Sequence, residues 1–531
     1  MLRIDQLRLL PGEDVSVLTA RAAKVLQIPE RDIQSLRLVR RSIDAREGVC
    51  FSCSVHVAVK NEERVLRRCR SRQVTKAEKL HYAPPAPIAP PELAPVIVGA
   101  GPAGLFAALL LAEAGAKPLL LERGQPVEQR QADVRRFWES GVLDTRSNVQ
   151  FGEGGAGAFS DGKLNTGTRD PRHRYILHRL VEFGAPEEIL TDAKPHVGTD
   201  RLHIVLRNLR AHLLRCGADI RFSHQLTDLT IDGGAVAAVT VAAPEGNYVL
   251  PCRRLILAPG HSARDTFALL HRLGVPMEPK PFAVGVRIEH RQKDIDAAQY
   301  GAYAGHPALP ASSYKLACHL PDGRGVFSFC VCPGGQVVAA ASEEGRLVTN
   351  GMSEFARDGE NINGGLLVSV TPSDFGGDDP LAGVAFQRRL EEAAFAAGGG
   401  GYAAPAQRVG DFLRRQPSTA AGAVTPSYLP RVRWTSLDEC LPPFIAESLR
   451  AALPLLDQKL PGFAAEDAVL TAVESRSSSP LRILRREEGE SPIAGLYPCG
   501  EGAGYAGGIT SAAVDGLRCA EAVLQDLGEK D

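Results

Sequence analysis

The 531-residue sequence predicts an α/β fold, and three observations lead to this prediction. From Pro95 onward, short apolar runs typical of buried strands alternate with helical patterns, as in a parallel sheet covered by helices. A glycine-rich turn directly follows the first of these runs. Near the C-terminus, Leu496–Gly516 repeats the succession of strand, glycine turn and helix. The length is sufficient for roughly two to four domains, so we expect a parallel sheet whose sequence is interrupted by an insertion.

Composition and charge are those of an ordinary globular protein. The formal net charge is -1, and nothing in it points to nucleic acid or to a membrane as a partner. Residues 1–80 carry 17 Lys and Arg against 10 Asp and Glu, so the remaining chain is acidic. This basic segment is either a contact surface for an acidic partner or a plain solvated face. The start, Met1–Asp5, has no apolar core of a secretory signal, and 11 scattered Cys fit a reducing compartment, so we expect a cytoplasmic protein.

Residues 1–82 predict a small β-α-β-β module. The expected strands are Leu2–Leu10, Ile33–Ile43 and Gly48–Lys60, and the expected helix is Glu13–Leu26. Cys50 and Cys53 match the C-x-x-C pattern, but they lie in a strand-like run in which positions i and i+3 face opposite sides. A redox pair would need a helix N-terminus, so we expect no redox role for them.

The remaining chain divides at proline-rich and glycine-rich segments. Residues 83–94 are a linker, because five Pro between Tyr82 and Pro91 favour an extended backbone. We expect residues 95–273 and 462–531 to form one discontinuous domain. Residues 274–461 would then be an inserted α+β domain on the substrate side.

The glycine-rich turn has the pattern of a Rossmann-type dinucleotide site. Strand Val96–Val98 leads into Gly99-x-Gly101-x-x-Gly104, a helix follows, and the next strand ends in Glu122. The glycines allow a tight turn, close approach of a pyrophosphate and close packing of helix on strand, and the acid can bind a ribose. That acid would repel a 2′-phosphate, which argues against NADP at this site. The predicted cofactor contacts here are Gly99, Ala100, Gly101, Pro102, Ala103, Gly104, Glu122 and Arg123.

Two further segments, Leu255–Gly260 and Gly495–Ala513, follow in an order that resembles FAD proteins with two dinucleotide-binding folds. The resemblance implies that FAD is the cofactor and that Glu501 binds its ribityl chain. It places Gly508, Ile509 and Thr510 at the pyrimidine end of the flavin, where a helix N-terminus stabilises negative charge. The further contacts predicted on this basis are Gly155, Ser160, Lys163, Leu226 beside the adenine, Ala258, Gly260 and Gly500.

Longer segments narrow this resemblance. Gln150–Leu164, Pro195–Asp200, Phe327–Gly335 and Glu474–Pro480 are similar to a bacterial family of NAD(FAD)-utilising or FAD-dependent dehydrogenases, and the similarity covers nearly the whole chain. A more distant likeness is to aminoacetone-oxidase-like flavoproteins. The resemblance implies an FAD-dependent oxidoreductase.

Three residues are candidates for catalysis, each with an alternative interpretation. Lys163 either stabilises reduced flavin or binds an anionic substrate, or it is a surface lysine. Arg476 either clamps a carboxylate or contacts the isoalloxazine, or it forms a salt bridge with Glu474. Cys332 shares a strand face with Cys330, so the two are either a strained redox pair or core cysteines.

The sequence thus predicts hydride transfer at flavin N5 to or from a small organic substrate of unknown identity, with an unknown electron partner. The alternative is a flavoprotein that acts on or docks to a macromolecule, in RNA modification or electron transfer, through the basic N-terminal module. No second G-x-G-x-x-G is present, so NAD(P)H would bind only transiently over the flavin. No spacing typical of a metal site is present, and we expect none.

Overall fold

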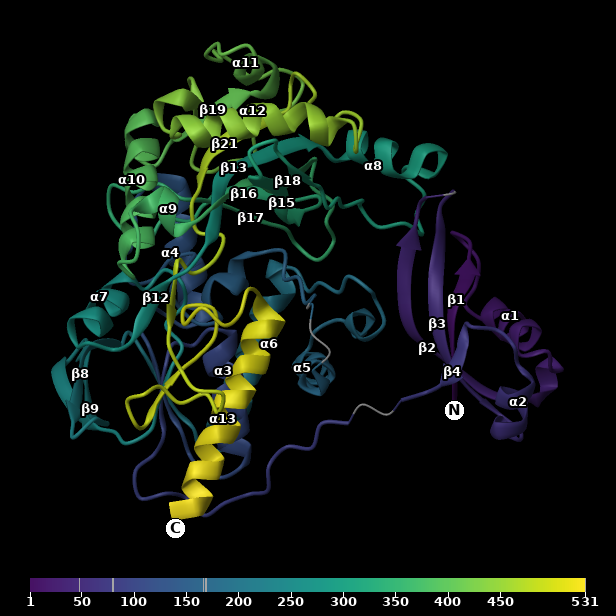
Figure 1. Cartoon of the computed structure of the whole chain (residues 1–531), viewed down its shortest axis with the longest axis horizontal. Helices are drawn as coiled ribbons and strands as arrows, with labels where there is room; N and C mark the ends of the chain where they lie inside the picture. Colours follow the sequence, from purple (N-terminus) through teal and green to yellow (C-terminus); the bar gives the residue numbers. More distant parts are fainter. Residues whose placement is uncertain (47, 79–80, 166, 168–169, 531) are drawn as a thin grey trace.

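The computed structural model describes residues 1–46, 48–78, 81–165, 167 and 170–530. An N-terminal module lies to one side of two larger domains that are stacked on each other (Figure 1). The lower of these contains a parallel sheet, and we call it the parallel-sheet domain. The upper one contains a seven-stranded sheet, and we call it the seven-stranded domain. The predicted α/β fold with a discontinuous parallel sheet is confirmed.

The N-terminal module is a helix packed on a four-stranded antiparallel sheet. The structure contains the expected β-α-β-β order and adds a short helix and an edge strand, which pairs with the first strand. Its elements are β1 (Leu2–Leu9), α1 (Val17–Leu26), β2 (Ile33–Asp44), β3 (Cys50–Val59), α2 (Glu62–Arg68) and β4 (Val74–Lys76), in the sheet order β2-β3-β1-β4. Arg41 joins the module to the parallel-sheet domain through Asp192, at 3.1 Å.

The proline-rich segment after the module is extended and carries no helix or strand in its described residues. It runs along the parallel-sheet domain (Figure 1), and the Ile88 N–H donates a hydrogen bond to the Ala114 carbonyl at 2.8 Å. The linker is therefore attached to the end of the first helix of that domain.

Five parallel strands form the central sheet of the parallel-sheet domain, in the order β23-β11-β5-β6-β7. They are β5 (Val96–Val98), β6 (Leu119–Glu122), β7 (Asp219–Phe222), β11 (Leu255–Leu257) and β23 (Leu496–Pro498). An antiparallel meander of β8 (Gln225–Asp232), β9 (Ala235–Ala243) and β10 (Gly246–Pro251) lies beside it. The helices are α3 (Pro102–Glu113), α4 (Val127–Ser140), α5 (Pro171–Glu182), α6 (Thr199–Arg215), α7 (Arg264–Arg272) and α13 (Ile509–Lys530).

Helix α3 is apolar around its whole circumference, because it is packed between the sheet and α13. Close packing of the two helices depends on Gly516, where an added Cβ would lie 2.1 Å from the Ala103 carbonyl oxygen. The last helix of the chain thus covers the first helix of the domain (Figure 1).

The seven-stranded domain has the sheet order β14-β15-β18-β13-β21-β19-β20 and is antiparallel except between β19 and β20. The strands are β13 (Phe282–Arg291), β14 (Ala317–His319), β15 (Gly325–Cys332), β18 (Asn361–Val370), β19 (Ala404–Arg408), β20 (Val432–Trp434) and β21 (Val469–Glu474). A hairpin, β16 (Gln336–Ala339) and β17 (Thr349–Met352), packs nearby, and the helices are α8 (Gln292–Tyr300), α9 (Pro372–Phe375), α10 (Ala382–Ala397), α11 (Val409–Leu413) and α12 (Pro443–Asp457).

The prediction that the chain returns to the parallel-sheet domain at residue 462 is wrong. Strand β21 pairs with β13 and β19 inside the seven-stranded sheet, so the insertion extends to Glu474. Strand β12 (Met277–Pro279) pairs with β22 (Leu481–Ile483). The segment that leaves the parallel-sheet domain therefore lies beside the segment that returns to it. None of the helices in the described part of the chain is long and apolar enough to cross a membrane.

Candidate active site

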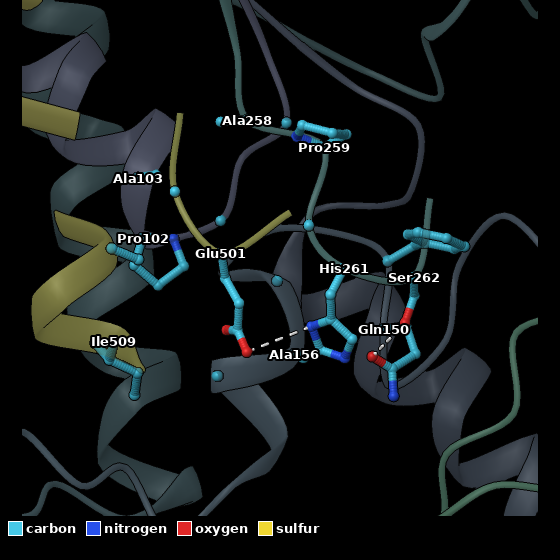
Figure 2. A pocket seen from close by; sticks show the side chains of 18 of the residues that line it. Pro102, Ala103, Gln150, Ala156, Ala258, Pro259, His261, Ser262, Glu501 and Ile509 are labelled. Atoms are coloured by element: carbon cyan, nitrogen blue, oxygen red, sulfur yellow. Dashed lines mark hydrogen bonds and ion pairs between the residues drawn. The ribbon is translucent and has the colours of Figure 1, made fainter. Parts of the chain in front are cut away.

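A cavity of about 350 Å³ lies between the carboxyl ends of the parallel strands and the seven-stranded domain. Its volume is in the range of small-molecule and cofactor sites, and ligands of open α/β sheets bind at this edge. Figure 2 shows the cavity with Pro102, Ala103 and Ile509 on one side and His261 and Ser262 on the other.

The glycine-rich turn has the geometry that a pyrophosphate requires. Gly99 has φ +101°, and a Cβ there would lie 2.1 Å from the Ala258 carbonyl oxygen, so only glycine fits. At Gly104 a Cβ would lie 1.9 Å from the Gly99 carbonyl oxygen, which lets helix α3 pack on the turn. Gly101 is the N-cap of α3 and lies on the cavity. The free N–H groups of the first helical turn therefore face the space where phosphates would bind.

Glu122 ends β6 at the cavity, as predicted for a ribose ligand, and it is almost fully buried. Its carboxylate accepts hydrogen bonds from the backbone N–H groups of Ala100 at 2.7 Å, Gly124 at 2.9 Å and Gly152 at 3.0 Å. Glu122 thus also holds the glycine turn in place, which the motif alone did not indicate. Arg123 lies over the Phe151 ring at 4.3 Å.

Glu501 projects from the turn after β23 into the cavity, where Figure 2 shows it facing His261. Burial raises the pKa of Glu501 to about 7 and lowers the pKa of His261 to about 3. The imidazole is therefore neutral, and its Nδ1 lies 3.7 Å from Glu501 Oε1. A carboxyl at this place can accept hydrogen bonds from the hydroxyls of a ribityl chain.

The N-terminus of α13 provides a second helix dipole at the same cavity. Gly507, Gly508 and Ile509 line it, as expected for the flavin end. Thr510 does not line it, because its side chain is buried and the hydroxyl donates a hydrogen bond to the Leu164 carbonyl at 3.0 Å. Two helix N-termini facing one cavity fit a cofactor that has a pyrophosphate at one end and a flavin at the other.

Lys163 is not a surface lysine. Its ammonium forms an ion pair with the buried Asp161 at 2.7 Å and donates a hydrogen bond to the Val331 carbonyl. Asp161 also pairs with Arg357, so one buried carboxylate serves two cations. Lys163 lines the cavity from this position and leaves positive charge beside the flavin end.

Glu474 and Arg287 form a fully buried pair at the opposite wall, 3.0 Å apart. Burial raises the pKa of Glu474 to about 7, although Arg287 partly offsets this. Glu474 lines the cavity, so the structure has a carboxyl there that can gain or lose a proton near neutral pH.

The predicted salt bridge between Glu474 and Arg476 is wrong. Both side chains are buried, but Arg476 points to α10, where its guanidinium contacts Glu391 at 2.8 Å. It also donates to the Ser342 hydroxyl at 2.6 Å. Arg476 lines the cavity, yet most of its donors are already used by protein groups.

The two cysteines of β15 occupy different places. Cys330 lines the cavity, whereas Cys332 is fully buried outside it, with its thiol 3.3 Å from the Cys330 carbonyl oxygen. The reason is a β-bulge between Phe329 and Cys332, in which Cys330 has φ +41°. A non-glycine residue in this left-handed region costs about 1–2 kcal/mol. The catalytic candidate Cys332 therefore does not reach the cavity, whereas Cys330 does.

Most of the predicted contacts lie on the cavity. Those that line it are Gly99, Gly101, Pro102, Ala103, Glu122, Arg123, Gly155, Ser160, Lys163, Leu226, Ala258, Gly260, Arg476, Gly500, Glu501, Gly508 and Ile509. Ala100, Gly104, Cys332 and Thr510 do not. Sequence reasoning missed His261, Ser262, Phe329 and Asn350, which also line it, because single polar or aromatic residues carry no pattern, whether in a turn or in a strand.

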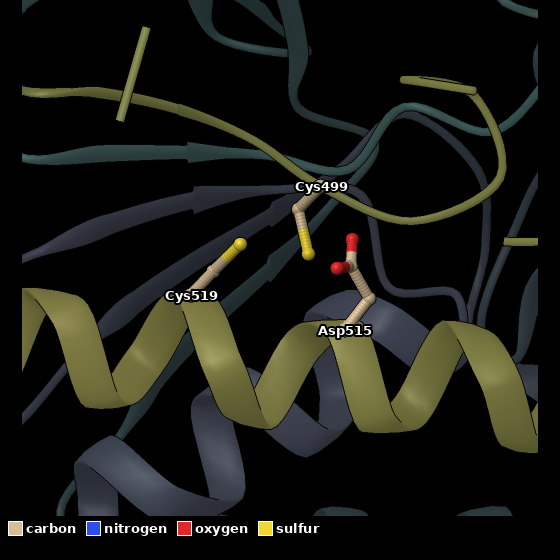
Figure 3. Close-up of side chains that lie close together, drawn as sticks. All are labelled: Cys499, Asp515 and Cys519. Carbon is tan, nitrogen blue, oxygen red and sulfur yellow. The ribbon is translucent and has the colours of Figure 1, made fainter. Parts of the chain in front are cut away.

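A group of possible metal ligands lies behind the Gly500 turn. Ligand atoms of Cys499, Asp515 and Cys519 are all within 4.8 Å of one another (Figure 3). Asp515 pairs with Arg485 at 2.5 Å and accepts a hydrogen bond from the Gly500 N–H at 2.7 Å. Because Arg485 already balances this carboxylate, we assign the group a structural role at the turn.

Comparisons with known proteins agree with this geometry. Residues 92–267 match the family described as FAD binding domain, residues 281–477 match "FAD-dependent protein, C-terminal domain-like", and residues 1–58 match a domain of unknown function. An uncharacterized protein of Clostridium beijerinckii is 46% identical over 99% of this chain and 98% of its own length.

Two further matches cover a smaller part of the chain or have low sequence identity. The 12-dehydrotetracycline 5-monooxygenase/anhydrotetracycline 6-monooxygenase of Streptomyces rimosus is 32% identical over 36% of this chain and 35% of its own length. A flavoprotein/dehydrogenase structure from Cytophaga hutchinsonii covers 83% of this chain and 80% of its own, with 12% identity and a TM-score of 0.38. The chain belongs to a bacterial family of FAD-dependent flavoproteins that join a Rossmann-type FAD-binding domain to an FAD-dependent C-terminal domain.

Proposed function

We propose that this protein is an oxidoreductase that transfers a hydride between flavin N5 and a small organic substrate. The observation that carries the proposal is the position of Glu474. A carboxyl with a pKa raised by burial to about 7 lies on the same cavity as the two helix N-termini of the FAD-binding domain. FAD, when bound, supplies the hydride chemistry, and the protein supplies position and electrostatics.

The residues of the chain have distinct roles in this proposal. Gly99, Gly101 and Glu122 would hold the adenosine and pyrophosphate half, and Glu501 would hold the ribityl chain. The N-terminus of α13, with Lys163 beside it, would stabilise negative charge at the flavin.

Glu474 would exchange a proton with the substrate at its carboxylate oxygen. Oxidation of an alcohol or amine by hydride removal also releases a proton, and reduction consumes one. Arg287, 3.0 Å away, holds the carboxylate in place through both protonation states.

An anaerobic absorbance titration tests the proposal. The FAD-loaded protein is mixed with NADH, with NADPH, and then with a panel of small alcohols, hydroxy acids and amines. Bleaching of the flavin bands by any of these supports hydride transfer, and bleaching by a nicotinamide identifies the protein as a reductase that binds NAD(P)H transiently. If the bands remain unchanged with every donor, the proposal is wrong.

The N-terminal module favours a second function, in which the flavoprotein docks to an acidic macromolecule such as RNA. Its sequence is basic, and Arg41 attaches it to the FAD-binding domain rather than leaving it on a free tether. RNA binding by the full chain is compared with RNA binding by a variant that lacks residues 1–78. If the variant binds RNA as well as the full chain does, this alternative loses its support. The cytoplasmic location that both functions assume rests on the scattered cysteines of the sequence.

A further inference from the structure

We infer that Cys330 and Cys332 form a redox-active dithiol that exchanges two electrons with the bound flavin. This inference rests on the FAD site of the proposed function and adds a second substrate class, a low-molecular-weight thiol or disulfide that reacts at the dithiol. The hydride proposal does not use these cysteines, and four features of the structure support the inference.

The first feature is the position of the sulfur atoms. Cys330 is half-buried and lines the FAD cavity, whereas Cys332 is buried behind it and its thiol donates a hydrogen bond to the Cys330 carbonyl oxygen at 3.3 Å. One sulfur can therefore be reached from the cavity and the other only through its neighbour. This division of roles is typical of dithiols that exchange with a partner.

The second feature is the backbone that brings the thiols together. On a regular strand, the distance between the Cα atoms of residues i and i+2 is close to the largest distance that a disulfide can span. The bulge in β15, with Cys330 at φ +41°, breaks that regular spacing at the position where a bond would have to form. Left-handed backbone at a residue other than glycine is frequently found at functional sites.

The third feature is a pair of cations that hold this bulge, the fully buried Arg287 and the half-buried Lys163. Arg287 donates hydrogen bonds to the Cys330 carbonyl at 3.1 Å and to the Cys332 sulfur at 3.7 Å. Lys163 donates to the Val331 carbonyl between them. The positive charge stabilises a thiolate, which is the reactive form of cysteine.

The fourth feature is the direction of the pKa shifts. The neighbouring Cys332 is the largest cause that lowers the pKa of Cys330, and Lys163 and Arg287 lower it further against burial. The neighbouring Cys330 and burial both raise the pKa of Cys332. The acids that face Cys330 are Asp161, Glu474 and Glu501, and the first two are paired with cations. Cys330 is thus the thiolate and Cys332 the thiol.

The exchange balances without any further reagent. Formation of the S–S bond between Cys330 and Cys332 releases two electrons and two protons, and FAD takes up the same number when it is reduced. Two molecules of a thiol substrate restore the dithiol: the first attacks Cys330 and forms a mixed disulfide while Cys332 leaves as a thiol, and the second attacks the sulfur of the first, which frees the Cys330 thiol and releases the substrate as its disulfide. In the opposite direction, reduced flavin opens the bond and a disulfide substrate is reduced.

The electron capacity of the FAD-loaded protein tests the inference. After mild oxidation with diamide and desalting, the wild type is titrated anaerobically with dithionite. We expect roughly four electron equivalents per FAD for the wild type and roughly two for Cys330→Ser and for Cys332→Ser. Cys216→Ser, a half-buried cysteine at the end of α6, is the matched control and should retain four.

Two measurements on the same samples separate the alternatives. Peptide mass spectrometry of the oxidised wild type, which needs no variant, should find the Cys330–Cys332 bond. Dithiothreitol should bleach the wild-type flavin at least about tenfold faster than that of Cys330→Ser. A wild type that takes up only two equivalents, or a loss of the extra two in Cys499→Ser instead, overturns the inference. Because FAD content and bleaching by dithionite are measured in each variant, failure of the dithiol is distinguishable from failure of the flavin function.

Discussion

Substitution of Glu391 by Gln should destabilise the junction of the two large domains. Glu391 lies on α10 and is completely buried. Its carboxylate accepts hydrogen bonds from Arg264 of α7 at 2.9 Å and from Arg476, after β21, at 2.8 and 2.9 Å. The side chain therefore connects the seven-stranded domain to the FAD-binding domain through charge that no water reaches.

The magnitude follows from what the substitution leaves behind. Gln keeps the shape but removes the negative charge, so two buried guanidinium groups retain only Glu343, which contacts them at 2.7 and 3.6 Å. Removal of one partner from a buried ion pair costs about 3–5 kcal/mol. For a domain of this size, that loss lowers Tm by roughly 6–20 °C.

The structure also predicts how the stability difference between the wild type and Glu391→Gln changes with pH. Burial alone would raise the pKa of Glu391, but Arg264 and Arg476 outweigh it and hold the pKa below its ordinary value of 4.5. A carboxyl whose pKa is lower in the folded state stabilises that state fully when the pH is above the pKa it has in the unfolded chain. This stabilisation is lost as the pH falls through the pKa of the carboxyl in the folded state. The difference between wild type and Glu391→Gln should thus be complete at pH 7 and shrink below about pH 4.5.

Thermal unfolding of the FAD-loaded protein, followed by circular dichroism at pH 7, measures the effect. The matched control is Glu392→Gln, the next residue on the same helix, whose partner Arg346 lies at 2.8 Å but whose side chain is 52% exposed. A surface pair of this kind is worth about 0–1 kcal/mol. A Tm of Glu391→Gln equal to that of Glu392→Gln would refute the reasoning.

Three further predictions concern the cavity. Glu122→Ala removes the acceptor for three backbone N–H groups as well as a ribose ligand, so FAD retained after gel filtration should fall roughly tenfold or more, and a variant that keeps full FAD would contradict the assignment. Gly99→Ala forces a Cβ to 2.1 Å from a carbonyl oxygen at φ +101°, so FAD affinity by fluorescence titration should drop roughly 100-fold. Gly528→Ala, in α13 away from the cavity and with open space at its Cβ, should change it by less than about twofold, and equal losses would argue against the cradle. In the wild type, the rate of flavin reduction by substrate should rise as the pH increases through about 7, because the Glu474 carboxyl loses its proton there. Glu474→Gln should abolish this rise, and a rise that persists in the variant would assign it to another group.

The glycine motif was predictable from the sequence because its geometry is local. Gly99, Gly101 and Gly104 are close in the chain to the strand and helix whose packing they permit, and Glu122 follows at a spacing set by one βαβ unit. The Gly500–Glu501 turn was predictable only through its resemblance to known FAD proteins. Both predictions placed residues on the same cavity, although they are almost 400 positions apart.

The errors concern pairing between distant segments. Nothing in Val469–Glu474 distinguishes a strand of the parallel sheet from one of the seven-stranded sheet, because both are apolar and short. One alternative for Arg476 was a salt bridge with its neighbour Glu474, but the partner on α10 is 85 positions away. Cys330 and Cys332 were expected to share a strand face because the sequence predicts a regular strand there, and a bulge depends on the partner strand.

The packing of α13 on α3 determines when this protein can first acquire its cofactor. β23 and α13 are synthesised after β5 and α3, yet β23 forms one edge of the parallel sheet and α13 forms the wall beside the flavin end of the cavity. Until both have been made, the apolar helix α3 lacks the helix that covers it. We therefore expect that FAD binds only after α13 has been made, and that truncation after Pro498 yields an aggregation-prone apoprotein rather than a weaker enzyme.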